Sequence, residues 1–411
     1  MEQESLKERS SYRGVEGSTS DILERHPADV FGPMLAQAAV HQGDGPRFGE
    51  LEFPKLWPDY TGDSYLVLSY RGIHEVLKSP HISSNIHEQG AELSVGRSLF
   101  SMDPPEHSTM RKLLMAGFTP AQVKRWEDIA FRPAVDAALD NATGLTSFDL
   151  VRQVIEIFPY RGFAKILGVP GDAGEWATDL AVDMVRSVSD PAAALRAAAE
   201  LGEYLIKIVE ERRAQPKDDF ISVLISAAVE DGRKLEDREL VNFLRHLFLA
   251  GVETTIRTSG TMMVHLLSEP SRWERIVADP SLIANAIDES LRLDPPANYF
   301  PRKATADIEV EGVKIPAGSI VYVAITAANR DPSRWPNPDE FDLDRPTKPS
   351  LSFSVGPHTC IGMHVGRREM TIFAEQLAQR MPAIRLDPDA GPPKIESWML
   401  RGPVTLPVVN G

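Results

Sequence analysis

The sequence predicts a mainly α-helical protein with small β-sheets, and three observations indicate this class. From Pro104 to about Pro295, Ala- and Leu-rich segments repeat apolar residues at helical spacing, interrupted by Pro and Gly. Alternation of apolar and polar residues is confined to short runs at residues 63–70 and 307–323. Residues with recognisable chemistry are spread from Asp103 to Glu369, which favours one integrated domain, residues 30–411, after an N-terminal arm, residues 1–29.

The composition is ordinary for a globular protein and excludes some function classes. The 411 residues are 42% hydrophobic and 25% charged, with a formal net charge of -15. The sequence contains no run of Lys or Arg that could bind a phosphate backbone, which argues against nucleic-acid binding. Residues 1–8 are polar, and the apolar run 320–328 is too short to cross a bilayer, which takes about 20 residues. We expect a cytoplasmic small-molecule enzyme that binds neither nucleic acid nor membrane.

The predicted β-structure lies before and after the helical part. The run 63–70 is a strand, and a helix follows from Tyr70. Apolar and polar residues alternate over residues 307–315, residues 316–318 form a Pro-Ala-Gly turn, and residues 319–323 form a second strand. This pattern predicts a β-hairpin in which the two strands pair. An irregular stretch rich in Pro, Asn and Asp reaches Arg345. A helix is expected after Gly362, followed by short strands.

One long helix is expected from Asp237, as its N-cap, to Ser259 or beyond. Residues 250–255, Ala-Gly-Val-Glu-Thr-Thr, lie in its middle, where Gly and β-branched residues are poor helix formers. The hydroxyl of Thr254 can donate to the carbonyl of Ala250, four residues back, and bend the helix. By itself this stretch also fits an ordinary core helix.

Cys360 is the single cysteine, so it has no partner for an internal disulfide. A lone cysteine is most often a small buried hydrophobe. Here it stands in the segment 353–362, Phe-Ser-Val-Gly-Pro-His-Thr-Cys-Ile-Gly. Gly356 and Gly362 allow the backbone to approach closely, and a helix starting near Gly362 would direct its positive end toward the sulfur. This arrangement suits a thiolate that binds a metal.

The segment 353–362 resembles the cysteine-ligand loop of cytochrome P450 enzymes, Phe-x-x-Gly-x-His/Arg-x-Cys-x-Gly, with every anchor present. Ser354 stands where the family usually has Gly. The segment 250–254 is similar to the family's Ala/Gly-Gly-x-Asp/Glu-Thr signature. The resemblance covers residues 63–408 and implies the cytochrome P450 fold, a haem b whose iron is held by the thiolate of Cys360, and insertion of one oxygen atom from dioxygen.

The resemblance also assigns roles to further residues. Glu253 and Thr254 would form the acid–alcohol pair that supplies protons for dioxygen cleavage. Glu289 and Arg292 would form a structural pair bonded to Arg345. The residues implied to contact the haem are His107, Arg111, Ala250, Gly251, Arg302, Phe353, Gly356 and His358.

The implied reaction is hydroxylation or epoxidation of a mid-sized hydrophobic molecule of terpenoid, steroid or aromatic type. Electrons would come from a separate ferredoxin with an NAD(P)H-dependent ferredoxin reductase. Two alternatives are a peroxide-using or rearranging haem-thiolate enzyme and a haem-binding sensor without turnover. We expect an acidic redox partner to dock on the cysteine side through Lys112, Lys124, Arg125, Arg367 and Arg368.

The side of the central helix that carries Thr254 is predicted to line the substrate site. At about 100° per residue, Leu247 lies within about 20° of Thr254 and His246 about 80° away. His246 could bond a substrate oxygen, or alternatively a backbone carbonyl of a neighbouring helix. The predicted substrate contacts are Leu99, His246, Leu247, Leu249, Ala250, Asn298 and Tyr299.

Overall fold

The computed structural model describes residues 25–53, 60, 62–89, 92–169, 176–177, 179–180, 183–184, 191–346, 348–398 and 400–410. Residues 1–24 of the expected N-terminal arm lie outside this part. The first described helix, α2 (Pro27–Gln37), begins within the stretch assigned to the arm. In the part described, no helix is both long and apolar enough to cross a membrane.

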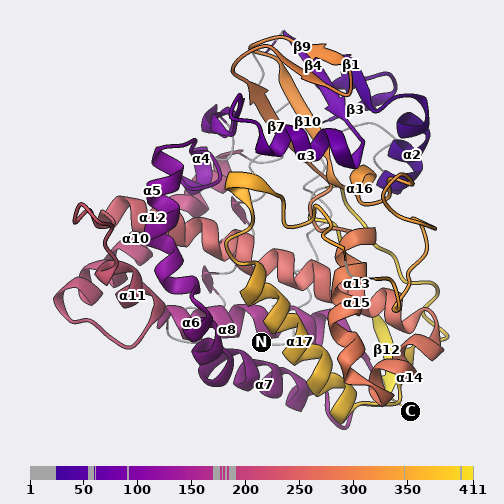
Figure 1. Cartoon of the computed structure of the whole chain (residues 1–411). Coiled ribbons are helices and arrows are strands. Elements are labelled where there is room, and N and C mark those ends of the chain that lie inside the picture. Colours follow the sequence, from indigo (N-terminus) through magenta and orange to yellow (C-terminus); the bar gives the residue numbers. More distant parts are fainter. Residues whose placement is uncertain are drawn as a thin grey trace.

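A seven-stranded sheet occupies one end of the molecule, together with α2 and α3 (Tyr70–Lys78) (Figure 1). Its central strand, β10, runs parallel to β4 and antiparallel to β7. Every residue of β10 is buried, because Tyr322 packs into one apolar cluster while Val321 and Val323 pack into another on the opposite face. In sheet order the strands are β3 (Leu51–Glu52), β2 (Arg47–Phe48), β1 (Val40–Asp44), β4 (Asp63–Val67), β10 (Ile320–Ala324), β7 (Tyr299–Ala304) and β5 (Ile82–Ser83).

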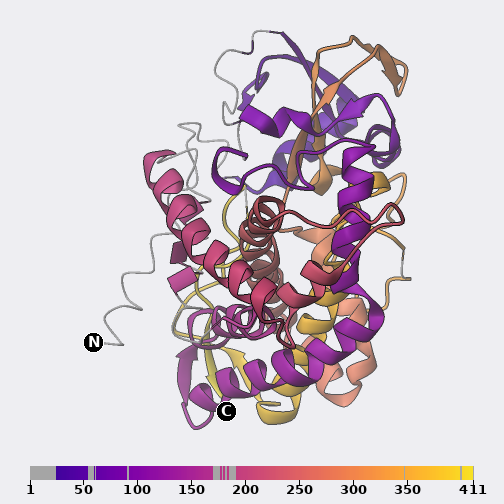
Figure 2. The same cartoon turned by 90° about the vertical axis from the view of Figure 1, so that its left-hand side faces the viewer.

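Helices fill the rest of the molecule, and a three-stranded sheet lies among them, away from the large sheet (Figures 1 and 2). The small sheet has the order β11 (Ile384–Leu386), β12 (Pro407–Asn410) and β6 (Ser147–Asp149). The helices are α4 (Glu92–Val95), α5 (Glu106–Leu114), α6 (Pro120–Trp126), α7 (Arg132–Ala142), α8 (Ile157–Leu167), α10 (Pro191–Ala214), α11 (Phe220–Ser226), α12 (Asp237–Leu247), α13 (Thr254–Leu267), α14 (Pro270–Ala278), α15 (Ile283–Leu293), α16 (Ile325–Ala328) and α17 (Met363–Arg380).

Helix α13 is the centre of this helical part. All residues from Thr255 to Val264 are buried, as expected for a helix surrounded by other elements on every side. Small residues let its neighbours approach closely: a Cβ atom on Gly260 would lie 2.7 Å from Cγ of Pro403. α13 packs against α15 and α17, and α17 carries the cysteine loop at its start.

The predicted strand and helix at residues 63–78 and the predicted helix after Gly362 are confirmed. β4 ends at Val67, and Ser69 caps α3 because its hydroxyl accepts from the N–H of Gly72, at 3.0 Å. The prediction that Asp237 caps the central helix is wrong. Glu236 is the N-cap. Its N–H donates to the carboxylate of Glu239 at 2.9 Å, and its own carboxylate accepts from the N–H of Glu239. This capping box fixes the N-cap one residue earlier than predicted.

The predicted pairing of residues 307–315 with 319–323 is also wrong. Residues 308–315 fold on themselves as β8 (Ile308–Val310) and β9 (Val313–Ile315). Glu311 and Gly312 both have positive φ, 51° and 78°, which is the two-residue turn that suits a hairpin. The following strand, β10, therefore pairs with β4 and β7 instead of β9.

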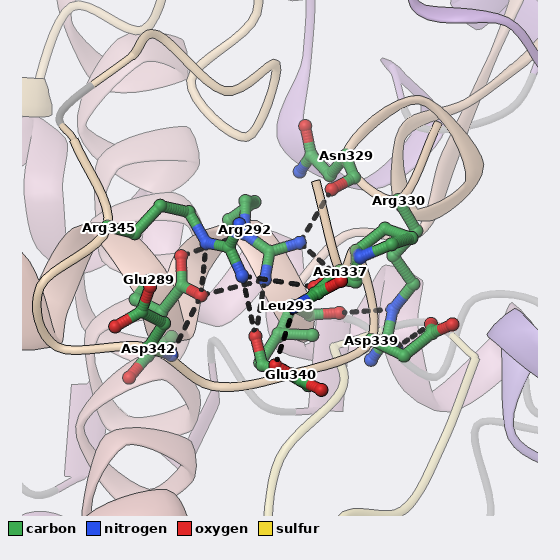
Figure 3. A network of polar contacts seen from close by, with 12 residues as sticks. Glu289, Arg292, Leu293, Asn329, Arg330, Asn337, Asp339, Glu340, Asp342 and Arg345 are labelled. Atoms are coloured by element: carbon green, nitrogen blue, oxygen red, sulfur yellow. Dashed lines mark hydrogen bonds and ion pairs between the residues drawn. The ribbon is translucent and has the colours of Figure 1, made fainter. Parts of the chain in front are cut away.

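The expected structural pair on α15 is confirmed (Figure 3). Glu289 and Arg292 are buried and form two contacts of 2.8 Å, and Nε of Arg345 donates to the same carboxylate at 2.8 Å. The guanidinium of Arg292 also donates to the carbonyls of Asn329, Pro338 and Glu340. A buried charge is stable only when it is paired and hydrogen-bonded, so this network holds the irregular stretch before the cysteine loop against α15.

Candidate active site

The central helix is interrupted where the sequence placed Gly and Thr. Between α12 and α13, residues Phe248–Glu253 form a π-helical segment, a distortion that is frequent at functional sites. Ala250 is exposed, and Leu249, Gly251 and Thr254 are half-buried, whereas Phe248, Val252 and Glu253 are buried. The hydroxyl of Thr254 donates to the carbonyl of Ala250 at 2.6 Å, as predicted. We call this side, with Ala250 and Thr254, the accessible face of the central helix.

The other signature residues of this segment turn away from the accessible face or pack closely. A Cβ atom on Gly251 would lie 2.5 Å from Cζ of Phe163, so the missing side chain makes room for α8. Glu253 is 5% exposed, and its carboxylate accepts from Nε of Arg257 at 2.6 Å. Glu253 and Thr254 therefore follow each other in sequence, but the carboxylate is held in a buried ion pair.

The cysteine loop has a tightly constrained backbone. The N–H of Cys360 donates to the carbonyl of Phe353 at 2.8 Å. Gly356 has a φ of +75°, and a Cβ atom there would lie 2.6 Å from the carbonyl oxygen of Leu77 in α3. Only glycine fits this position, as the sequence predicted. Ser354, which departs from the family pattern, also has positive φ, +59°.

The thiol of Cys360 is accessible, yet protein atoms surround it closely enough that burial raises its pKa. Three groups oppose this by favouring the thiolate: the N–H groups of Gly362 and Met363 at the start of α17, and the guanidinium of Arg111. A helix start and a cation are the usual means of stabilising a thiolate. The local structure therefore supports the sulfur as a metal ligand.

Four basic side chains gather near this thiol: His107, Arg111, Arg302 and His358. Burial lowers the pKa of Arg302 to about 10 and that of His358 to about 3, and it also lowers the pKa of His107 and of Arg111. The rings of His107 and His358 lie 4.3 Å apart. Within the described residues none of the four forms an ion pair with a carboxylate. The lowered pKa values leave the two imidazoles neutral near pH 7, whereas Arg111 and Arg302 keep their charge. A buried guanidinium without a carboxylate partner is costly, so an anionic group would suit this place.

The sequence analysis missed a second buried histidine beside this cluster. His87, in the 3₁₀ turn Asn85–Gln89, is 5% exposed, and its Nε2 lies 3.5 Å from Nη1 of Arg302. The ring of Phe100 lies 4.0 Å from that of His87 and 5.6 Å from that of His246. No motif marks His87 or Phe100, because their place depends on how the 80–102 segment packs against the sheet and the central helix.

The predicted substrate contacts are brought together only in part. His246 packs against Phe100, and its Nδ1 lies 3.4 Å from Oγ of Ser98, so its partner is a hydroxyl and not the alternative backbone carbonyl. Burial lowers the pKa of His246 to about 4, which keeps the imidazole neutral near pH 7. Leu99 and Leu247 are buried, and Leu249 is half-buried.

Asn298 and Tyr299 do not join this group. The amide of Asn298 donates to the carbonyl of Trp398 at 2.7 Å and accepts from the hydroxyl of Thr326. The ring of Tyr299 lies 4.2 Å from that of Phe53, inside the core beside the large sheet. Asn298 precedes β7 and Tyr299 begins it, and both side chains have their partners inside the protein, away from His246.

The residues present fit a haem. No three His, Cys, Asp or Glu side chains converge as a metal site in the described part of the chain. A porphyrin supplies four nitrogen ligands, and its two propionates are anions that match the unpaired cations near Cys360. The accessible thiol of Cys360 would hold the iron of such a group.

Comparison with known proteins agrees with this geometry. The family model described as "Cytochrome P450" matches residues 176–408. The mycinamicin IV hydroxylase/epoxidase of Micromonospora griseorubida is 31% identical, over 88% of this chain and 94% of that protein. The vitamin D(3) 25-hydroxylase of Pseudonocardia autotrophica is 31% identical, over 92% of this chain and 94% of that protein.

A solved structure is similar over the same extent. A cytochrome P450 from Bacillus megaterium in complex with testosterone has a TM-score of 0.81 and 28% identity, and the alignment covers 94% of this chain and all of that one. The mainly α fold with small sheets, the haem cofactor and the monooxygenase class follow from these matches. The chain belongs to the cytochrome P450 family of haem-thiolate monooxygenases.

Proposed function

We propose that this enzyme hydroxylates or epoxidises a mid-sized hydrophobic molecule, of terpenoid, steroid or aromatic type, that carries one polar group. The observation that supports this proposal is a neutral imidazole, His246, that packs against Phe100 shortly before Ala250 in the central helix, with the apolar residues Leu247 and Leu249 between them in sequence. An apolar site with one convergent polar group is typical of small-molecule recognition. A relative named for vitamin D(3) and a neighbour solved with testosterone support this size of substrate.

The proposed roles of the site residues follow from their chemistry. When bound, the haem supplies an iron that activates dioxygen for transfer of one oxygen atom to the substrate. Cys360 would bind the iron as a thiolate, stabilised by the N–H groups of Gly362 and Met363. The remaining haem contacts would be His107, Arg111, Arg302 and His358 at the propionates, Phe353 and Gly356 around the sulfur, and Ala250 and Gly251 on the opposite side.

Thr254 and Glu253 would deliver the protons that dioxygen cleavage consumes. The hydroxyl of Thr254 lies on the accessible face and can accept a hydrogen bond while it donates to Ala250. Glu253 would renew the proton supply at that hydroxyl through water. The two electrons would come from a ferredoxin and its NAD(P)H-dependent reductase.

The Cys360→Ser variant tests the thiolate ligand. We expect the reduced carbon monoxide complex of the variant to lack the thiolate-type absorption band, because a serine oxygen donates less charge to iron than a sulfur. Thr359→Ser is the matched control, since it changes the neighbouring side chain and leaves the sulfur in place. Retention of the thiolate-type band in Cys360→Ser would show that the assignment is wrong.

A turnover assay separates the proposed function from its alternatives. Compounds are first screened for displacement of iron-bound water, seen as a spin-state change, and the best are then assayed with a generic ferredoxin system and NADH. We expect NADH consumption that depends on the compound and yields an oxygenated product. Turnover without NADH would identify a peroxide-using or rearranging enzyme, and binding without turnover would identify a sensor.

A further inference from the structure

The carboxylate of Glu253 is not directly exposed, so its protons need a route from solvent. Its partner, Arg257, is 6% exposed, and the two side chains form a buried ion pair at 2.6 Å. Arg257 is fixed from the other side as well: its Nη1 lies 3.4 Å from the carbonyl of Pro403, and a Cβ atom on Gly402 would lie 2.8 Å from its Cδ. Arg257 is therefore a stationary positive charge, and a guanidinium cannot itself pass on a proton.

A second carboxyl group, Glu156, approaches the same arginine from α8. The N–H of Glu156 donates to the carbonyl of Val151 at 2.8 Å, which places Glu156 one π-helical turn beyond Val151. Cγ2 of Val151 in turn lies 3.7 Å from where a Cβ atom of Gly260 would be, and Gly260 is one turn beyond Arg257 on α13. The π-helical turn Val151–Ile155 therefore packs against α13, and across this contact Glu156 is close enough to interact with the charges of Arg257 and Glu253.

The electrostatics of Glu156 agree with this placement. Its pKa is raised to about 7, mainly by burial; Arg257 and Arg152 act to lower the pKa, and the negative charges of Glu253 and Asp149 act to raise it. The outer pair is closer to solvent, because the side chains of Arg152 and Asp149 are 31% and 21% exposed, with 3.6 Å between Nε and Oδ2. Charges thus alternate from the surface inward: Asp149, Arg152, Glu156, Arg257 and Glu253.

We propose that Glu156 is a positioning residue that takes protons from solvent and passes them to Glu253, with Arg257 as the counter-charge that the two carboxyl groups share. This inference rests on the proposed role of Glu253. In the step, the O–H bond of the protonated Glu156 breaks and a new O–H bond forms on the carboxylate of Glu253, directly or through one water. Glu156 becomes the carboxylate and is then reprotonated from solvent at the Arg152 end.

The shared arginine makes this transfer inexpensive in electrostatic free energy. Before the step, one carboxylate, on Glu253, accompanies the guanidinium of Arg257. After it, one carboxylate, on Glu156, accompanies the same guanidinium. The buried region therefore keeps one positive and one negative charge throughout, so no unpaired charge is created in a poorly solvated place.

Glu156→Gln tests the relay by turnover, because glutamine keeps the shape of the side chain but carries no transferable acidic proton. We expect the ratio of product formed to NADH consumed to fall on the order of tenfold near pH 7, with electrons diverted to hydrogen peroxide. In the unaltered enzyme this ratio should decline as pH rises through about 7, where Glu156 loses its proton, whereas the variant should lack that decline. Glu156→Asp should restore part of the ratio, and Glu274→Gln, on the exposed side of α14, is the matched control.

Infrared titration of the substrate-free protein gives a second readout that does not depend on activity. The carboxylic acid C=O band should lose a component with a midpoint near pH 7, and Glu156→Gln should lack this component. In Glu253→Gln the midpoint should fall, because the negative charge that raises the pKa of Glu156 is gone. A midpoint unchanged by Glu253→Gln would overturn the proposed coupling.

The outcomes also separate this inference from the proposed function. If Glu253→Gln and Thr254→Ala lose coupling while Glu156→Gln keeps it, the relay through Glu156 is wrong and the proposed roles of Glu253 and Thr254 stand. If Glu253→Gln and Thr254→Ala both stay fully coupled, those roles fail and the relay fails with them.

Discussion

Ser354 adopts a backbone conformation in which a side chain is strained. Its φ is +59°, which costs a residue with a Cβ atom about 1 kcal/mol, and its buried hydroxyl finds no hydrogen-bond partner within the described residues. We expect Ser354→Gly to raise the free energy of unfolding by about 1 kcal/mol, after the larger chain entropy of glycine is deducted. Thermal unfolding of the haem-loaded protein measures this.

Ser352→Gly is the matched control for Ser354, because it lies two residues earlier and its hydroxyl donates to the carbonyl of Leu291 at 2.6 Å. We expect that change to lower the melting temperature. A melting temperature that falls in Ser354→Gly as well would contradict the strain argument.

His246 is the residue expected to orient a polar substrate. Its imidazole is neutral near pH 7 and already lies 3.4 Å from the hydroxyl of Ser98, so the other ring nitrogen can bond a substrate oxygen. We expect His246→Phe to weaken binding of an oxygenated substrate by about 1 kcal/mol, roughly fivefold in Kd, with little effect on its hydrocarbon analogue. Spin-state titrations of the two compounds measure the difference, and equal effects on both would exclude the hydrogen bond.

At the scale of elements, the break in the central helix is held by hydroxyl groups. Thr254 and Thr258 each donate to the carbonyl four residues back, at 2.6 Å and 2.8 Å, but Thr258 is buried while Thr254 borders the accessible face. We expect Thr254→Ala to bind haem and substrate but to divert most electrons to hydrogen peroxide, because the proton-delivering hydroxyl is lost. Thr258→Ala loses an equivalent hydrogen bond and should stay coupled; comparable peroxide yields from both variants would contradict the proposed role.

A single carboxylate, Asp294 at the end of α15, joins four parts of the chain. It bonds His26 at the start of α2 (2.7 Å), His265 of α13 (3.0 Å) and Arg401 (3.0 Å). Asp294→Asn would leave the charge of Arg401 buried without its partner, which typically costs about 3 to 5 kcal/mol. Chemical denaturation at pH 7 measures the loss. Asp339→Asn, whose carboxylate is 74% exposed and pairs with Arg330, should cost less than about 1 kcal/mol.

The contribution of Asp294 depends on pH. Its hydrogen bonds and the charge of Arg401 hold its pKa well below the usual value, despite burial. A depressed folded-state pKa stabilises the protein above the unfolded pKa of about 4, and this stability is lost as pH falls through the folded value. The stability difference between the unaltered protein and Asp294→Asn should therefore shrink as pH falls below about 4. A difference that stays the same below about pH 4 would contradict this assignment.

At the scale of the whole molecule, nearby carboxylates neutralise most of the positive charge on the expected docking surface. Among its cations, Arg368 bonds Glu127 at 2.6 Å, Arg367 bonds Asp288 at 2.6 Å, Lys124 bonds Asp128 at 3.3 Å, and Arg125 pairs with Asp218. Lys112, on the exposed side of α5, forms no such pair within the described residues. The electrostatic attraction of an acidic partner would therefore depend mainly on Lys112.

Lys112→Gln should lower the rate of electron transfer from an acidic ferredoxin by roughly two- to fivefold at low salt and flatten its salt dependence, because an exposed charge acts mainly on association. Lys303→Gln, at an exposed residue of β7, is the control and should change neither. Rates in the unaltered enzyme that do not fall with added salt would remove the electrostatic basis of docking.

What could be predicted from the sequence was local. The hydrogen bond from Thr254 to Ala250, the glycine at position 356 and the pair of Glu289 with Arg292 all follow from spacing within a few residues, which helix and turn geometry fix. The same spacing could have indicated the ion pair of Glu253 with Arg257. The family and its cofactor were likewise recognisable from one ten-residue segment around Cys360.

The tertiary structure decided everything that depends on which surfaces meet. Residues 319–323 were predicted to be one arm of a hairpin, but the strand formed there, β10, pairs with β4 and β7; Tyr299 turns into the core beside the sheet, and His87 joins Arg302 across 215 positions of sequence. Glu156 and Arg257 come together only because the π-helical turn Val151–Ile155 packs against α13. Local sequence determines turns and helix faces through short hydrogen bonds, whereas contacts between distant segments depend on burying apolar surface from the whole chain, which no single segment encodes.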